Sequence, residues 1–296
     1  MKELVVISGK GGTGKTSIVA SFAALARDKV LADCDVDAAD LHLVLNPEVE
    51  RSEEFKAGKQ ARVIPDKCAA CGRCLELCAF EAVSFDGPGT EAVAKTCRID
   101  PVACEGCGVC AHFCPAAAIE LEEVVAGQWF VSRTRFGPLV HARLGVAEEN
   151  SGKLVSLVRS QARRLAAEKG LDLVVIDGPP GIGCPVIASI TGASLVLVVT
   201  EPTLSALHDL ERVRQLTGHF GIPTAVCINK YDLNERLSRR IERIAAGLDA
   251  RVIGKVRYDN AVTRAQLMRS SVVEYTGGLV SSQIGELWRE VVCALG

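Results

Sequence analysis

A glycine-rich segment near the start of the chain, Gly9–Thr16 with the sequence GKGGTGKT, has the spacing of a phosphate-binding loop. It follows the apolar run Glu3–Ser8 and precedes a helix expected over Lys15–Arg27, which is the context that such a loop needs. Glycines let backbone N–H groups converge on phosphate oxygens, and the helix N-terminus adds the positive end of its dipole. We expect Lys15 to reach the β and γ phosphates of a nucleotide and the Thr16 hydroxyl to bind Mg²⁺. The predicted nucleotide contacts in this segment are Gly11, Gly12, Thr13, Gly14, Lys15, Thr16 and Ser17.

Three polar residues stand where apolar strands are expected to end. Asp177 follows the apolar run 171–176 and precedes a Gly/Pro loop, and an acid there can hold Mg²⁺ through water. Asp35 comes just after the expected strand 29–33, where it could position the water that attacks the γ-phosphate. Acidic caps and turns at strand ends are the alternative for both. Asn229 ends a later strand and could contact an edge of the nucleotide base.

Eight of the thirteen cysteines form two groups with the same spacing, 36 residues apart: Cys68, Cys71, Cys74 and Cys78, then Cys104, Cys107, Cys110 and Cys114. This is the spacing of a bacterial ferredoxin with two 4Fe-4S clusters, in which the fourth cysteine of each group binds the other cluster. We therefore predict one cluster on the first three cysteines with Cys114, and another on the second three with Cys78. Zinc is the less favoured alternative, because zinc sites usually pair two short Cys hooks across a longer loop.

Five cysteines lie outside these groups. We interpret Cys34, Cys227 and Cys293 as small hydrophobic residues, since free cysteine is often buried. Cys97 lies just before the second group, where it is either filler or a spare ligand. Cys184 lies seven residues after Asp177.

Apolar strand-like runs alternate with amphipathic helical stretches on both sides of the cysteine-rich block. This pattern predicts an α/β fold with a mostly parallel sheet and helices on both faces. The cysteine block interrupts the pattern, so we predict an inserted ferredoxin-like domain over 61–122 between two parts of one domain, 1–60 and 123–296. The polar segment 46–61 is expected to be the entry linker, and 137–143 to be a loop.

Composition excludes several classes of function. The 296 residues are 48% hydrophobic and 24% charged, which indicates a folded globular protein. Lys and Arg number 34 against 36 Asp and Glu, so we expect no nucleic-acid partner and no membrane partner. Residues 1–8 are too short for the apolar region of a signal peptide, and thirteen cysteines without one indicate a cytoplasmic protein with metal-binding thiols.

Lys10 within GKGGTGKT resembles the additional lysine in the deviant phosphate loop of the MinD/ParA-type ATPases. Residues 1–60 and 123–296 resemble this P-loop family, which includes the nitrogenase iron protein and the Mrp-type cluster carriers. With its insertion, the whole chain resembles the MinD-superfamily ATPases that contain a ferredoxin domain. Some of these are called cobyrinic acid a,c-diamide synthase-like because of shared ancestry.

The resemblance implies ATP-dependent homodimerisation, with Lys10 reaching the phosphates of the opposite subunit. It also implies that Lys10, Lys15, Asp35 and Asp177 are the catalytic residues, and that Asn229 recognises adenine. Asp209 resembles the acid that pairs with the additional lysine when no nucleotide is bound. Cys184 matches one intersubunit cluster ligand of the nitrogenase iron protein, but residues 128–160 contain no cysteine for the second.

Together these features predict an ATPase whose nucleotide state gates electron transfer from two 4Fe-4S clusters to a redox partner protein. The cofactors expected are ATP, Mg²⁺ and the two clusters. The alternative is a maturation ATPase that assembles metal clusters or hands them to a cluster-accepting partner. Two full sets of four cysteines favour retained clusters, whereas Cys97 and Cys184 keep the alternative open.

Overall fold

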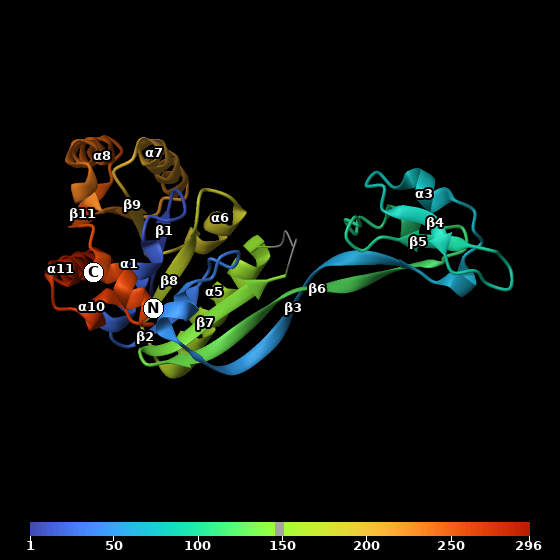
Figure 1. Ribbon diagram of the computed structural model, residues 1–296, viewed down its shortest axis with the longest axis horizontal. Coiled ribbons are helices and arrows are strands. Elements are labelled where there is room, and N and C mark those ends of the chain that lie inside the picture. Colours follow the sequence, from blue (N-terminus) through green and yellow to red (C-terminus); the bar gives the residue numbers. More distant parts are fainter. Residues whose placement is uncertain (146–150) are drawn as a thin grey trace. The chain divides into compact units, whose positions relative to one another are not determined.

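The computed structural model describes residues 1–145 and 151–296, which fall into two compact units (Figure 1). The first unit comprises Met1–Glu53 and Gly127–Gly296, and the second comprises Glu54–Ala126. The predicted insertion at 61–122 lies within the second unit. In the described part of the chain, no helix combines the length and the apolar character needed to cross a membrane.

A nine-stranded sheet with the order β11-β10-β9-β1-β8-β2-β7-β6-β3 is the base of the first unit. Pairing is parallel from β11 to β7, while β6 pairs with β7 in the antiparallel direction. The predicted α/β class with a mostly parallel sheet is therefore confirmed. The strands are β1 Lys2–Ser8, β2 Lys29–Asp33, β3 Glu48–Val63, β6 Ile119–Thr134, β7 Gly137–Leu144, β8 Leu173–Pro180, β9 Leu195–Thr200, β10 Thr224–Asn229 and β11 Arg251–Val256.

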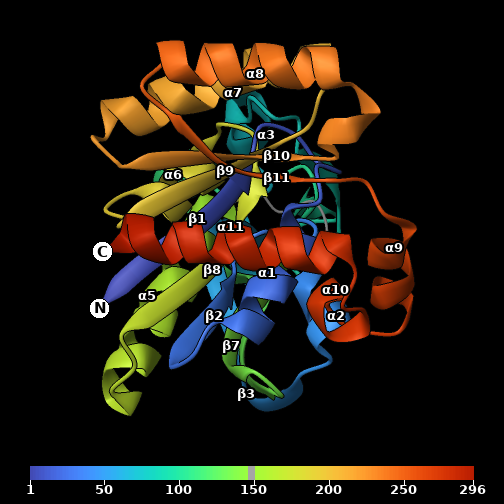
Figure 2. The same ribbon diagram turned by 90° about the vertical axis from the view of Figure 1, so that its left-hand side faces the viewer.

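Helices cover both faces of the parallel strands. Helices α1 and α11 lie on one face of the sheet (Figure 2). On that face, Leu4 of β1, Phe22 of α1 and Leu287 of α11 belong to one apolar core. On the other face, α5 packs on β2 and β7, α6 on β8, and α7 on β9. The helices of this unit are α1 Lys15–Leu25, α2 Leu41–Leu45, α5 Ser151–Lys169, α6 Cys184–Ile190, α7 Leu204–His219, α8 Glu235–Gly247, α9 Asn260–Leu267, α10 Val272–Tyr275 and α11 Leu279–Leu295, with a 3-10 turn at Tyr231–Leu233.

Two segments that the sequence predicted as irregular are strands. The expected linker 46–61 lies mostly in β3, next to β6 in the sheet, where Phe55, Ala57 and Ala61 are buried and most other side chains face solvent. Its charged residues do not prevent pairing, because an edge strand can expose one face to water. The expected loop 137–143 lies in β7, where residues 139–142 are all buried between β2 and β6.

The second unit contains two copies of a short cysteine-bearing turn. Each copy is a loop with a left-handed glycine followed by a helix, Gly72 (φ 76°) before α3 Arg73–Leu77 and Gly108 (φ 78°) before α4 Val109–His112. The 36-residue repeat of the sequence is thus also a structural repeat. An antiparallel pair, β4 Val83–Gly87 and β5 Thr96–Ile99, and a 3-10 turn at Pro65–Lys67 complete the unit.

A buried ion-pair group joins β1 to α5. Glu3 is 3% exposed and accepts hydrogen bonds from Arg159 Nη2 at 2.5 Å and from Arg163 Nε at 2.5 Å. Burial alone would raise the pKa of Glu3, but the hydrogen bonds from Arg163 and Arg159 lower it below its ordinary value. Arg159 is itself 4% exposed, so it depends on Glu3 for its counter-charge.

We expect Glu3→Ala to lower the free energy of unfolding by about 3–5 kcal/mol at pH 7, because it leaves the buried guanidinium of Arg159 without a counter-charge. The folded-state pKa of Glu3 lies below the unfolded value, near 4.3, so this stabilisation is present above that pH and is lost as the pH falls through the folded-state pKa. Urea titrations of both proteins at pH 7 and at pH 3 measure the difference and its decrease. Glu168→Ala, which removes an exposed pair with Arg164, is the control and should change little. Equal losses in the two variants at pH 7 would contradict the prediction.

Candidate functional site

A polar cleft lies at the carboxyl ends of the parallel strands. Its walls are the phosphate loop and the start of α1 (8–17), parts of the segment after β2 (35–40), the end of β10 (229–230) and the segment 257–266. Gly12 (φ 79°) and Gly14 (φ 87°) turn the loop into α1 in the left-handed region that favours glycine. A Cβ on Gly14 would also come 2.3 Å from Asn229 Nδ2, so this position has no room for a side chain.

Lys15 is surrounded by carboxylates at the base of this cleft. Its Nζ lies 2.5 Å from Asp177 Oδ1 and 3.4 Å from Asp35 Oδ2, and the residue is 6% exposed. Burial alone would lower the pKa of Lys15, but Asp177 and Asp35 raise it above its ordinary value. The structure therefore brings together three of the predicted site residues around one ammonium group.

Asp33 is a further acid that sequence reasoning did not single out. Its carboxylate accepts hydrogen bonds from the backbone N–H groups of Asp35 (3.1 Å) and Leu41 (3.2 Å), and it is fully buried. Burial and the nearby Asp177 raise the pKa of Asp33 well above its ordinary value. Asp33 thus holds the segment 35–41 in place. The signal that could have identified Asp33 is its place in the sequence: it ends the expected strand 29–33 and is the first acid of Asp33-Cys34-Asp35.

Two polar atoms in this region lack partners and suit a bound magnesium nucleotide. Asp177 Oδ2 and Thr13 Oγ1 are buried and make no hydrogen bond within the described residues. Thr13 and Thr16 line the cleft, and Asp177 contacts Lys15 in its wall. Carboxylate and hydroxyl oxygens are the ligands that Mg²⁺ prefers, directly or through water. The residues present therefore fit a Mg²⁺–phosphate group.

Lys10 pairs with a different acid from the one that sequence resemblance indicated. Its Nζ lies 2.8 Å from Glu201 Oε1 and bonds to Thr203 Oγ1 at 3.2 Å. The prediction that Asp209 pairs with Lys10 is wrong for this structure, because Asp209 packs against Gly9 instead. Glu201 follows β9 directly, and its position at a strand end was the signal that could have identified it.

Glu201 also links a second lysine to the phosphate loop. Lys230 Nζ lies 3.0 Å from Glu201 Oε2 and donates a hydrogen bond to Gly12 O at 2.9 Å. Burial alone would raise the pKa of Glu201, but Lys10 and Lys230 lower it below its ordinary value. Two ammonium groups therefore stand beside the loop, one on each oxygen of a shared carboxylate.

Asn229 supports the phosphate loop from the neighbouring strand. Its Nδ2 donates to Thr13 O at 2.7 Å, and its Oδ1 accepts from the backbone N–H of Lys230 at 3.0 Å. The amide thus makes one donated and one accepted hydrogen bond inside the protein, and its contact with a nucleotide base stays a prediction. Gln266 reaches the same helix start from α9, where it donates to Ser17 Oγ at 2.9 Å.

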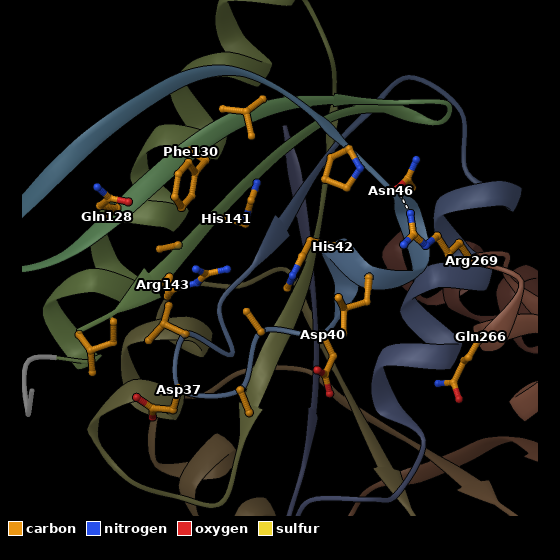
Figure 3. A pocket seen from close by; sticks show the side chains of 18 of the residues that line it. Asp37, Asp40, His42, Asn46, Gln128, Phe130, His141, Arg143, Gln266 and Arg269 are labelled. Atoms are coloured by element: carbon orange, nitrogen blue, oxygen red, sulfur yellow. Dashed lines mark hydrogen bonds between the residues drawn. The ribbon is translucent and has the colours of Figure 1, made fainter. Parts of the chain in front are cut away.

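A larger cavity adjoins the cleft and shares Ala38, Asp40 and Gln266 with it (Figure 3). In its wall the ring of His141 stacks on Phe130, with centroids 5.0 Å apart, and on His42 at 6.0 Å. Burial, His42 and Arg143 lower the pKa of His141 to about 4, so this ring is neutral at pH 7. The segment after β2 therefore forms a wall common to the nucleotide cleft and this cavity.

The eight repeated cysteines of the second unit line two small cavities. Cys68, Cys71, Cys74 and Cys114 line the first, and Cys78, Cys104, Cys107 and Cys110 line the second. In each cavity, three thiols come from one copy of the repeat and the fourth from the other copy. This is the combination that the spacing of the cysteines indicated.

Backbone groups point at the crossing cysteines. The N–H of Ala82 donates to Cys78 Sγ at 3.4 Å, and the N–H of Ala118 donates to Cys114 Sγ at 3.3 Å. Within the described ranges, no three His, Cys, Asp or Glu side chains gather closely enough to hold a single metal ion. The four repeated thiols at each cavity match in number the ligands of one 4Fe-4S cluster.

The remaining cysteines differ in their surroundings. Cys34 and Cys227 are fully buried, as expected of small hydrophobic residues, and burial raises the pKa of Cys227 to about 12. Cys293 is exposed in α11, so its interpretation as a core residue is wrong. Cys184 is exposed at the start of α6. Cys97 is 3% exposed and lines the first cysteine cavity.

Comparison with known proteins agrees with the fold and the cleft. The family model described as the CobQ/CobB/MinD/ParA nucleotide binding domain matches residues 4–272. Uncharacterized protein MJ0578 of Methanocaldococcus jannaschii is 35% identical over 235 residues, which cover 78% of this chain and 79% of that protein. Uncharacterized protein MJ0579 of the same organism is 23% identical over 267 residues, which cover 79% and 83%.

Solved structures resemble the chain over nearly its whole length. The septum site-determining protein MinD complexed with Mg-ADP from Pyrococcus horikoshii gives a TM-score of 0.57 at 16% identity, and the match covers 98% of this chain and 95% of that one. The MinC:MinD cell division protein complex from Aquifex aeolicus gives 0.58 at 16% identity, with 99% and 96% covered. These likenesses concern the fold, whereas the family match covers most of the sequence. The chain therefore belongs to the CobQ/CobB/MinD/ParA family of nucleotide-binding domains.

Proposed function

We propose that this protein binds and hydrolyses Mg-ATP, and that its nucleotide state controls electron transfer from two 4Fe-4S clusters to a partner protein. The observation that carries the proposal is the pairing of the cysteines. Each of two cavities is lined by three thiols of one repeat copy and one of the other, in a chain that also has a phosphate-loop cleft. Family membership supports the binding of a nucleotide. The cysteine cavities support the proposed clusters and electron transfer.

In the cleft, the phosphate loop presents backbone N–H groups to the phosphates, and the start of α1 adds the positive end of its dipole. Lys15 lies at the base of the cleft, where it can move from Asp177 and Asp35 to phosphate oxygens. Thr16 and Asp177 would hold Mg²⁺, and Asp35 would orient the attacking water. Mg²⁺ neutralises charge that develops on the phosphates. The MinD of Pyrococcus horikoshii, which shares this fold, is complexed with Mg-ADP in its structure, and this supports a magnesium nucleotide as the ligand of the cleft.

Lys10 supports a nucleotide-dependent homodimer. Its side chain is 33% exposed at the mouth of the phosphate loop and is held by Glu201 and two hydroxyl groups. Release from Glu201 would free this ammonium group to reach the phosphates of a second copy. Since Lys230 also binds Glu201, that carboxylate keeps a counter-charge after Lys10 leaves.

In the second unit, the cysteines would hold the clusters, each of which accepts and releases one electron at a time. The left-handed glycines Gly72 and Gly108 let the loops turn closely around each set of thiols. The N–H groups of Ala82 and Ala118 donate to cysteine sulfur, and such hydrogen bonds tune the potential of a cluster. The four repeated thiols of each cavity favour clusters that stay bound to this protein over clusters that it hands to another protein.

An anaerobic redox titration followed by EPR tests the proposal. We expect the iron-loaded protein to contain about eight irons per chain, as two four-iron clusters require. Its cluster potentials should differ between Mg-ADP and a non-hydrolysable ATP analogue by about 59 mV, which corresponds to about 1.4 kcal/mol of coupling. Lys15→Ala is the matched control, because it should abolish the shift without touching a cysteine. An unchanged potential in the wild-type protein would contradict gating and favour cluster transfer to an acceptor protein.

A further inference from the structure

The two cysteine cavities differ by one thiol. The cysteines in the lining of the second cavity are its four repeated ones, whereas Cys97 joins the four repeated cysteines in the lining of the first. Cys97 belongs to neither copy of the repeat and lies in β5, which pairs with β4. The strand places a fifth thiol where the internal symmetry of the unit requires none.

Cys97 is buried beside the repeated cysteines of its cavity. It is 3% exposed, and Cys68 and Cys74 line the same cavity. By contrast, Cys227 is buried among apolar residues in the core of the first unit. Cys97 therefore lies where it could serve as an additional ligand beside the four repeated cysteines of the first cavity.

We propose that Cys97 is a reserve ligand for the cluster of the first cavity, able to replace Cys74 on iron. This inference rests on the proposed function, since it presupposes the cluster. In the exchange, the bond between iron and Cys74 sulfur breaks and a bond between iron and Cys97 sulfur forms. The Cys97 proton passes to the Cys74 sulfur, so that the charge of the cluster and the number of protons are unchanged.

The repeat supplies a matched pair of variants, because Cys74 and Cys110 hold the same place in the two copies. Iron content and EPR of the reduced protein are the readouts, and neither depends on ATPase activity. We expect Cys74→Ala to keep about eight irons per chain, because Cys97 takes the vacant place and loses its proton to solvent. Cys110→Ala should lose iron, since its cavity has no fifth thiol. The double variant Cys74→Ala/Cys97→Ala should lose as much iron as Cys110→Ala.

Each outcome bears on the proposal. Iron loss in Cys74→Ala equal to that in the double variant would overturn it, and so would retention in both. Loss of iron from Cys97→Ala alone would also overturn it, because a reserve ligand is not needed when Cys74 is present. Cys68→Ala, with and without Cys97→Ala, repeats the comparison if Cys74→Ala does not fold. A wild-type protein that binds no iron would instead refute the proposed function, so the two failures are distinguishable.

Discussion

Replacing Lys15 with alanine should reduce Mg-ATP hydrolysis by about a hundredfold or more, the usual loss when one preorganised group that stabilises transition-state charge is removed. Lys15 is the ammonium group nearest to Asp35 and Asp177, at 3.4 Å and 2.5 Å. Without it, these carboxylates would face the phosphates of ATP with no counter-charge and would repel them. We therefore expect nucleotide affinity and turnover to fall together.

Lys29→Ala is the matched control for this substitution. Lys29 is 6% exposed, as Lys15 is, but it is the first residue of β2, at the end of the strand opposite to the cleft. Its Nζ donates to Ala26 O at 2.8 Å. Its loss should lower stability while the hydrolysis rate stays within about twofold of wild type, because it is outside the nucleotide cleft. Phosphate release and nucleotide titration measure both variants. Hydrolysis by Lys15→Ala within tenfold of the wild-type rate would contradict the assignment.

Sequence alone located the parts of the site that depend on local backbone geometry. The phosphate loop was predictable because its glycines, its lysine and the following helix are contiguous in the chain. The pairing of the cysteines was predictable because the repeat sets which thiols can meet. Asp35 was placed correctly just after β2, because the carboxyl ends of parallel strands meet at one edge of the sheet, whereas β8 continues past Asp177 to Pro180, so the strand end expected there is wrong.

Contacts between distant segments could not be predicted in this way. Glu201 lies 191 residues from Lys10, directly after β9, whereas Asp209 lies in α7. Only the packing of these elements decides which of the two acids contacts Lys10. The strand β7 was missed because its histidine and arginine suggested a loop, although His141 is buried against Phe130 and His42. Polar residues inside a strand do little to indicate that strand in the sequence when the side chains that they contact lie in other elements.

The segment after β2 connects the nucleotide cleft to the adjoining cavity. Asp33 holds it through the N–H groups of Asp35 and Leu41, Asp35 reaches Lys15, and Asp40 lines both the cleft and the adjoining cavity. When Lys15 turns from Asp35 to a phosphate group, the segment loses one of its contacts to the base of the cleft. A change in nucleotide state would therefore alter the wall of the neighbouring cavity as well (Figure 3).

Iron removal should have the second large effect, because the second unit has little core of its own. Across Glu54–Ala126 the buried apolar side chains are few and mostly small, such as Ala61, Ala82 and Ala118, while Phe80 and Phe113 are 47% and 48% exposed. Domains this small usually need disulfides or metal to fold, and structural zinc contributes on the order of 10 kcal/mol to comparable ones.

We therefore expect the iron-free chain to lose nearly all amide-exchange protection in 54–126 and to become open to proteases there. The first unit is the internal control, since its core residues, among them Phe22, Leu31 and Ile176, are fully buried and contain no predicted iron ligand. Hydrogen exchange read by mass spectrometry compares the two units in one sample, with and without iron. Protection that stays at its iron-loaded level in 54–126 would show that apolar packing is sufficient, and that the thiols contribute nothing to the fold through metal. Selective loss there would instead mean that the proposed cluster ligands also hold the unit together, because metal binding and folding are then one equilibrium.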